Sequence, residues 1–215
     1  MISKRKKAVA ISSFLVLCLA MGFVFFLQKK TNKKDIPVSY MSACWAIDIT
    51  NLNQVVGYAD QVFIGYVNNQ TGTDYSFAAP LTMYDVTVIS NIKGDAPIGE
   101  TVTVAKDGGL SKDGSVYILY ENDSLLEVGQ YYAFCTNSTP EGYYLACGPT
   151  TTKSISLSSS NNASLAKVRK AAKKSSANFA STVLSDDIVK ELEQSDVYTE
   201  YQHAFEHELP NPFRH

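Results

Sequence analysis

The chain has 215 residues, of which 45% are hydrophobic and 19% charged, and its formal net charge is −2. The charges are separated along the chain, because all 21 acidic residues follow position 34 while eight of the 19 basic residues precede position 35. The remainder carries eleven basic and 21 acidic residues, a net charge of −10. Such a surface repels phosphate backbones, which argues against nucleic-acid binding.

The first 28 residues predict a membrane anchor. The basic residues 1–7 precede an uncharged segment of 20 residues, 8–27, and about 20 apolar residues in a helix span the hydrocarbon layer of a bilayer. A cleaved signal peptide has a shorter core and a small-x-small cleavage site, and cleavage after Ala20 would leave the apolar residues 23–27 in the mature chain. We therefore expect an uncleaved signal anchor over residues 1–28 and a polar, lysine-rich tether over residues 29–41.

Residues 42–150 have the pattern of a small β domain. A short helix is expected at 51–58, capped by Thr50. Stretches rich in β-branched and aromatic residues, separated by turn residues, predict strands at 61–68, 81–92, 100–105, 115–120, 130–136 and 142–147. The last two strands flank turn residues at 137–141 and predict a hairpin. Strands at this spacing predict a mainly β fold, a small barrel or a sandwich.

The chain changes character after residue 150. The serine-rich residues 151–162 predict a linker, and residues 163–215 predict a helical C-terminal region. Apolar residues at spacings of three and four predict a helix over 163–184. Ser185 is expected to cap a second helix, with Asp186 and Asp187 in its first turn, and a third helix over 197–209 ends at Pro210.

The order of these signals over residues 59–148 resembles the netrin-like modules, the OB-fold barrels found in tissue inhibitors of metalloproteinases and in many secreted proteins. The resemblance rests on ADQVFIGYV at 59–67, VTV at 86–88 with IKG at 92–94, TVTV at 101–104, LEVGQYY at 126–132 and YYLAC at 143–147. It implies a five-stranded OB-like barrel. The inhibitors of this family use an N-terminal cysteine, whereas Cys44 lies deep in the chain, so the resemblance does not extend to protease inhibition.

The resemblance also implies a disulfide between Cys44, upstream of the first strand, and Cys147, which closes the last hairpin. A bond from Cys44 to Cys135 and three unrelated buried thiols are the alternatives. In a hairpin centred on the turn at 137–141, Cys135 lies opposite Tyr144 or its neighbour. Cys147 is then about 10 Å further along the ladder, too far for a bond to Cys135.

The orientation of the anchor is not decided by the positive-inside rule, because Lys29, Lys30, Lys33 and Lys34 follow the span and nearly balance the basic residues before it. A disulfide would suit an oxidising compartment, and no cytoplasmic type of catalytic motif is present downstream. We therefore predict a single-pass protein of the cell membrane, inserted through residues 8–27, with its C-terminal region outside the cytoplasm.

One short motif is typical of a catalytic zinc site. His203, Glu206 and His207 form an H-x-x-E-H pattern, which on a helix places two histidines on one face, suited to zinc, with the glutamate as a base. Enzymes with this motif need a further acidic ligand far downstream, and only eight residues follow His207. The motif is therefore kept as an alternative, a metal-dependent hydrolase, beside the interpretation as an exposed polar helix face.

Two pairs of tyrosines are candidates for a binding face. Tyr131 and Tyr132 lie on one predicted strand and Tyr143 and Tyr144 on the next, and one member of each pair points to the core because side chains alternate along a strand. Cross-strand packing is the favoured interpretation, and an aromatic face for a peptide or glycan is the alternative.

Together these features predict a membrane-anchored extracytoplasmic binding module without enzymatic activity or cofactor, whose partner is an unidentified extracytoplasmic protein or a ligand of the cell envelope. The alternatives are the metal-dependent hydrolase and a protein of envelope stress or immunity.

Overall fold

The structure, a computed structural model, describes residues 36–149, 151–172 and 182–213, with side chains except at 167–172. The described residues from Pro37 onward form one compact unit. The predicted anchor and residues 29–35 of the predicted tether lie outside the described residues. Within the described ranges, no helix combines the length and the apolar character needed to cross a membrane.

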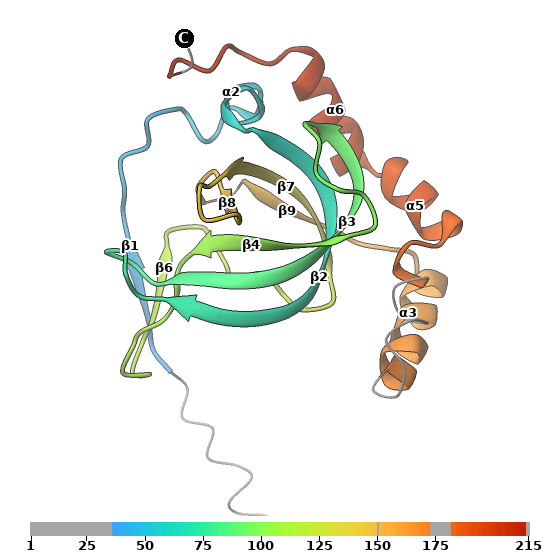
Figure 1. The fold of residues 1–215 in the computed structure, drawn as a ribbon, viewed down its shortest axis with the longest axis horizontal. Helices are drawn as coiled ribbons and strands as arrows, with labels where there is room; N and C mark the ends of the chain where they lie inside the picture. The colour runs from blue at the N-terminus through green and yellow to red at the C-terminus, as the bar shows by residue number, and fades with distance from the viewer. Residues whose placement is uncertain (1–35, 150, 173–181, 214–215) are drawn as a thin grey trace, which may run out of the picture. The chain divides into compact units, whose positions relative to one another are not determined.

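The core of the fold is a five-stranded mixed β-barrel, consistent with an OB-like fold (Figure 1). Its strands, in their order around the barrel, are β2 (Gln61–Asp74), β3 (Leu81–Lys93), β4 (Thr101–Asp107), β8 (Tyr144–Ala146) and β7 (Tyr131–Ser138). Strand β7 pairs with β2 and closes the ring. All neighbours are antiparallel except β4 and β8, which are parallel. The predicted mainly β fold with a five-stranded barrel and C-terminal helices is confirmed.

Strand β2 is long and bent, which allows one strand to belong to two layers of packing. It continues six residues beyond the predicted end, because its polar residues 69–74 pair with the start of β3. Four register irregularities interrupt this pairing, and bulges of this kind bend a strand and increase its twist. Side chains alternate along the first half of β2, so Tyr66 lies on the outside of the barrel and Phe63 and Val67 on the inside.

Apolar side chains form two cores, one inside the barrel and one on its outer face. Strand alternation divides the residues of β7 between them, with Tyr132 and Phe134 inside and Tyr131, Ala133 and Cys135 outside. The outer core is covered by helices. These are α2 (Leu52–Tyr58), α3 (Ser159–Ala172), α5 (Asp186–Glu193) and α6 (Asp196–Glu206). Figure 1 shows α5 and α6 along one side of the barrel and α2 across one end.

The cap of α2 is Asn51 rather than the predicted Thr50. The side chain of Asn51 accepts hydrogen bonds from the amides of Asn53 (3.1 Å) and Gln54 (3.4 Å). The Thr50 hydroxyl instead donates to Asp48 (2.6 Å). At the predicted second helix, Ser185 occupies the N-cap position of α5, but its side chain makes no capping hydrogen bond.

Two predicted boundaries differ from the structure, because each segment finds a strand partner far away in sequence. Part of the predicted tether is strand β1 (Val38–Met41), which pairs in parallel with β6 (Tyr117–Tyr120), and β6 pairs with β5 (Gly109–Leu110). Part of the predicted linker is β9 (Thr152–Ile155), which pairs with β7. Because β1 belongs to a three-stranded sheet with β6 and β5 and β9 belongs to the barrel sheet, residues 42–150 contain neither sheet in full.

Candidate functional site

The predicted disulfide between Cys44 and Cys147 is absent, and the three cysteines of the described residues are free thiols. Cys44 is exposed, whereas Cys147 is buried in the outer core. The segment upstream of the barrel does reach the end of β8, but it does so through the next residue: the ring of Trp45 lies against Gly148. Trp45, and not Cys44, thus makes the contact with the end of β8.

The register of the β7–β8 hairpin is also different from the predicted one. Thr136 pairs with Ala146 and Ser138 with Tyr144, and the amide of Cys147 donates to the carbonyl of Cys135 (3.0 Å). The turn lies at 139–143, where the Thr139 amide donates to the Tyr143 carbonyl (3.0 Å). Cys135 thus lies opposite Cys147, and the prediction that they are three residues apart on the ladder is wrong.

The three residues of the H-x-x-E-H motif are exposed at the C-terminal end of α6. The rings of His203 and His207 stack at a centroid distance of 4.2 Å. The Nδ1 atom of His207 lies 2.9 Å from the carbonyl oxygen of His203 and is engaged there. Among the residues that the structure describes, no group of three or more histidine, cysteine or acidic side chains is placed to hold a metal ion.

The four candidate tyrosines do not share one exposed face. Tyr131 is buried in the outer core, against Tyr66 at a centroid distance of 4.8 Å, and Tyr132 is buried inside the barrel. Tyr144 is half-buried and lies 6.0 Å from the ring of Phe63. These three side chains pack within the domain, and Tyr143 is half-buried.

An open apolar hollow lies at the end of the barrel where the β2–β3 loop, residues 75–80, meets β1. It has a volume of about 320 Å³. We call it the aromatic hollow, and its lining residues are Met41, Ser42, Phe77, Ala78, Ala79, Leu81, Asp107, Tyr120 and Leu145. Phe77 stands at its rim with 58% of its surface exposed. Four of the large apolar side chains exposed among the described residues belong to β1 and this loop: Val38, Tyr40, Tyr75 and Phe77.

A buried ion pair involves Lys106, the residue before Asp107 of this lining. The Nζ atom of Lys106 lies 3.0 Å and 2.8 Å from the two carboxylate oxygens of Asp123, and the two side chains are only 1% and 9% exposed. The neighbouring Asp107 lines the aromatic hollow. Asp123 lines a second, more polar hollow of about 530 Å³ between α2, β9 and α6. The ion pair thus ties β4, next to Asp107, to the segment that follows β6 and contains Asp123.

Asp107 is the acidic residue in the lining of the aromatic hollow. Burial raises the pKa of its carboxyl and the charge of Asp123 raises it further, while Lys106 opposes both. The otherwise apolar hollow thus contains one carboxyl group, and ionising that group costs free energy. A partner that brings a positive charge or a hydrogen-bond donor would relieve that cost.

Replacing Asp107 with asparagine is expected to stabilise the fold at neutral pH. A carboxyl with a raised folded-state pKa contributes stability that is fully present below its unfolded pKa, 3.8, and is lost as the pH rises through the folded pKa. The variant avoids this loss. Its advantage in urea unfolding should appear at pH 7 and vanish below pH 3.8; an equal difference at both pH values would contradict the assignment.

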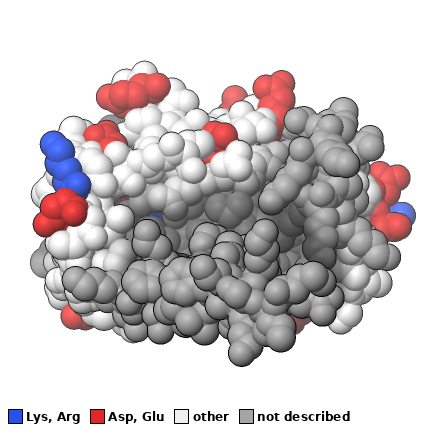
Figure 2. All heavy atoms as spheres, turned by 90° about the horizontal axis from the view of Figure 1, so that it is seen from below, with Lys and Arg blue, Asp and Glu red and all other residues white. Residues whose placement is uncertain are grey.

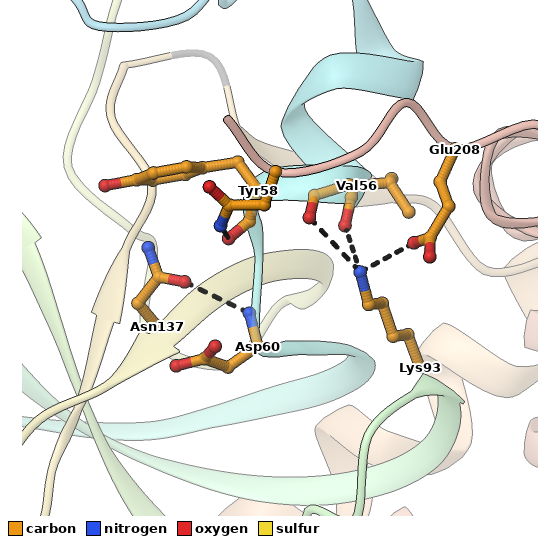
Figure 3. A network of polar contacts seen from close by, with 8 residues as sticks. Val56, Tyr58, Asp60, Lys93, Asn137 and Glu208 are labelled. Carbon is orange, nitrogen blue, oxygen red and sulfur yellow. Dashed lines mark hydrogen bonds and ion pairs between the residues drawn. The ribbon is translucent and has the colours of Figure 1, made fainter. Parts of the chain in front are cut away.

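A polar network joins the C-terminal segment to α2, as Figure 3 shows. The ammonium of Lys93 donates to the carbonyls of Val56 (2.8 Å) and Gly57 (3.4 Å) and pairs with Glu208 (2.6 Å). These carbonyls lie at the C-terminal end of α2, where a cation is favoured by the helix dipole. Strand β3 runs from Leu81, which lines the aromatic hollow, to Lys93. The network therefore joins β3, α2 and the C-terminal segment at the barrel end opposite to the hollow.

On the face seen in Figure 2, the acidic side chains of the described residues lie at separate places. Figure 2 shows basic side chains at few places on that face. This agrees with the three lysines against twelve acids that the sequence has between residues 42 and 150. The barrel domain that contains the aromatic hollow is therefore acidic on balance.

Sequence reasoning did not find the aromatic hollow. Met41 falls in the predicted tether, and Phe77 falls in a loop of polar residues. The one signal available was the presence of large apolar residues within segments that are otherwise polar. Compared with known proteins, the chain matches no family model and no curated protein.

Proposed function

We propose that this chain is a membrane-anchored binding module that works outside the cytoplasm and holds an apolar segment of another envelope protein in the aromatic hollow. The observation that carries the proposal is the open apolar hollow with Phe77 exposed at its rim. Exposed apolar surface of this kind marks interaction sites, and aromatic side chains supply much of the binding energy there. The anchor over residues 1–28 and the extracytoplasmic placement are parts of this proposal.

The position of the hollow in the barrel supports a binding role. OB-folds bind their ligands with the second and third barrel strands and the loop between the first two. The corresponding elements here are β3, β4 and residues 75–80, and they contribute Leu81, Asp107 and Phe77 to the hollow. We propose further that the barrel is a netrin-like variant of the OB-fold, whose ligand is a protein.

The charge of the surface limits the partner. The net charge of −10 beyond residue 34 disfavours anionic polymers, and Asp107 in the hollow favours a segment that is apolar with a donor or a positive charge beside it. Protein segments of that composition meet both requirements.

The test uses a cysteine placed at the hollow of the full-length chain, in the cells that make it. Phe77→Cys is introduced together with Cys44→Ala, and intact cells are labelled with a membrane-impermeant maleimide that carries a photocrosslinker. Ile98→Cys is the matched control, because Ile98 is 60% exposed and follows the other end of β3. Both positions should be labelled, and only position 77 should give a discrete protein adduct after irradiation.

A charge in the hollow should abolish that adduct. Ala78 lines the hollow and is exposed, so Ala78→Glu leaves the folded core intact while a partner would have to bury its carboxylate. The yield should fall about tenfold or more, and Ala46→Glu, at an exposed site outside the lining, should leave it unchanged. Labelling of neither position would refute the placement outside the cytoplasm. An equal adduct from both positions would refute the hollow as the site.

A further inference from the structure

Cys135 and Cys147 are placed as the two halves of a cross-strand disulfide. Thr136 pairs with Ala146, so the next step of the antiparallel ladder sets Cys135 against Cys147, joined by the hydrogen bond between their main chains. The two residues make one of the two main-chain bonds of a hydrogen-bonded pair, whose Cα atoms lie about 5.5 Å apart. Disulfides join Cα atoms about 4.4 to 6.8 Å apart, so the backbone needs no rearrangement.

The two side chains also point to the same side of the sheet. Directly opposed residues on antiparallel strands share a face, and both thiols belong to the outer core. The main chain is held on each side of the pair: the Cys135 amide donates to the carbonyl of Thr151 (3.3 Å), and Val62 of β2 pairs with Cys135. We propose that Cys135 and Cys147 form a structural disulfide within the β7–β8 hairpin when the chain folds in the presence of an oxidant.

The reaction is a thiol–disulfide exchange with a disulfide of low molecular weight or with an oxidised dithiol oxidoreductase. The thiolate of one cysteine attacks the oxidant's disulfide and releases one of its sulfurs as a thiol. The thiolate of the other cysteine then attacks the mixed disulfide, forming the Cys135–Cys147 bond and releasing the second sulfur. The protein loses two electrons and two protons, and the oxidant gains both.

The burial of both thiols in the folded chain indicates that this reaction takes place during folding, before α6 packs against the barrel. Cys135 is fully buried and Cys147 is 7% exposed, and Tyr201 of α6 is buried in the same core. Burial raises the pKa of both thiols, that of Cys147 to about 12, and Lys93 lowers them only in part. In the native state few thiolates are present and no oxidant reaches them. The unfolded or half-folded hairpin has neither restriction.

The proposed disulfide can be tested on the purified full-length chain in detergent. This test does not depend on the compartment in which the protein works. The reduced chain is unfolded in denaturant, refolded in a glutathione redox buffer, alkylated under denaturing conditions and cleaved after lysine, arginine and glutamate. Glu141 lies between the two cysteines, so cleavage yields the separate peptides 128–141 and 142–153. We expect these two peptides to be linked, and the Cys44 peptide to be alkylated.

Two further measurements distinguish a disulfide bond from two thiols that only pack against each other. Folded, reduced protein in the same buffer should oxidise at least tenfold more slowly than refolding protein. The oxidised chain should melt about 5 to 10 °C above its reduced form, with the same difference in Cys44→Ala and none in the Cys135→Ala, Cys147→Ala double variant. Complete alkylation of both cysteines after refolding, or a link from either of them to Cys44, would overturn the inference even if the double variant failed to fold.

Discussion

Replacing Lys106 with alanine is expected to lower the free energy of unfolding by about 3 to 5 kcal/mol. The substitution leaves the Asp123 carboxylate, 9% exposed, without the ammonium that lies 2.8 Å from it. A buried charge whose partner has been removed keeps the cost of its dehydration and loses the attraction that offsets this cost. Urea unfolding at pH 7 measures the effect.

The chain offers a matched control for this prediction. Lys153 pairs with Glu200, and these side chains are 48% and 49% exposed. Exposed pairs contribute about 0 to 1 kcal/mol, so Lys153→Ala should change little. The double variant Lys106→Met, Asp123→Leu removes both charges and should recover most of the loss. If Lys106→Ala were no more harmful than Lys153→Ala, the pair would have to be hydrated.

Replacing Gly57 with alanine is expected to destabilise the fold by about 1 to 3 kcal/mol. Alanine usually favours a helix over glycine by about 1 kcal/mol, so the normal expectation for a position in α2 has the opposite sign. A Cβ atom at Gly57, however, would lie 1.8 Å from the carbonyl oxygen of Leu209. That oxygen belongs to the main chain and cannot turn away as a side chain could.

The damage should be concentrated in the C-terminal segment. Residues 208–211 are held on α2 by the hydrogen bond from the Leu209 amide to the Asn53 carbonyl (3.1 Å) and by the network around Lys93. Hydrogen exchange of the Leu209 amide should accelerate in Gly57→Ala. Gly72→Ala is the control, because a Cβ atom at Gly72 of β2 meets nothing within 4 Å. Equal protection of Leu209 in the two variants would contradict the collision.

The sequence predicted the barrel strands well, because they alternate in hydrophobicity, but it misplaced the last hairpin by two residues. Residues 137 and 138 look like turn residues, since asparagine and serine favour turns. In the structure they extend β7, because Asp60 binds both: its amide donates to the Asn137 side chain (3.1 Å), and its carboxylate accepts from the Ser138 amide (2.9 Å). Figure 3 shows the contact with Asn137. Hydrogen bonds from Asp60, 77 residues before Asn137, thus set the register of the β7–β8 hairpin. The predicted distance between Cys135 and Cys147 was wrong because it assumed a different register.

The aromatic hollow was beyond sequence reasoning for a related reason. Periodicity identifies strands and helices that bury one face, but it does not show which polar segments meet in space. Met41 and Tyr120 come together because β1 pairs with β6, 79 residues later in the chain, and Phe77 joins them from a loop. In contrast, the H-x-x-E-H motif is visible in sequence and has its two histidines side by side, yet no third ligand approaches among the described residues.

The parallel pairing of β1 with β6 has a mechanical consequence for a chain anchored as we propose. The ladder is bounded by hydrogen bonds from the Tyr117 amide to the Pro37 carbonyl (2.8 Å) and from the Glu121 amide to the Met41 carbonyl (3.3 Å). Tension that enters at the first residue of β1 and leaves from the last residue of β6 acts along the strands. The rungs are then loaded together in shear and are not opened one at a time. Because Met41 and Tyr120 end these strands and line the aromatic hollow, a pull on the anchor would strain the hollow before it strained the barrel.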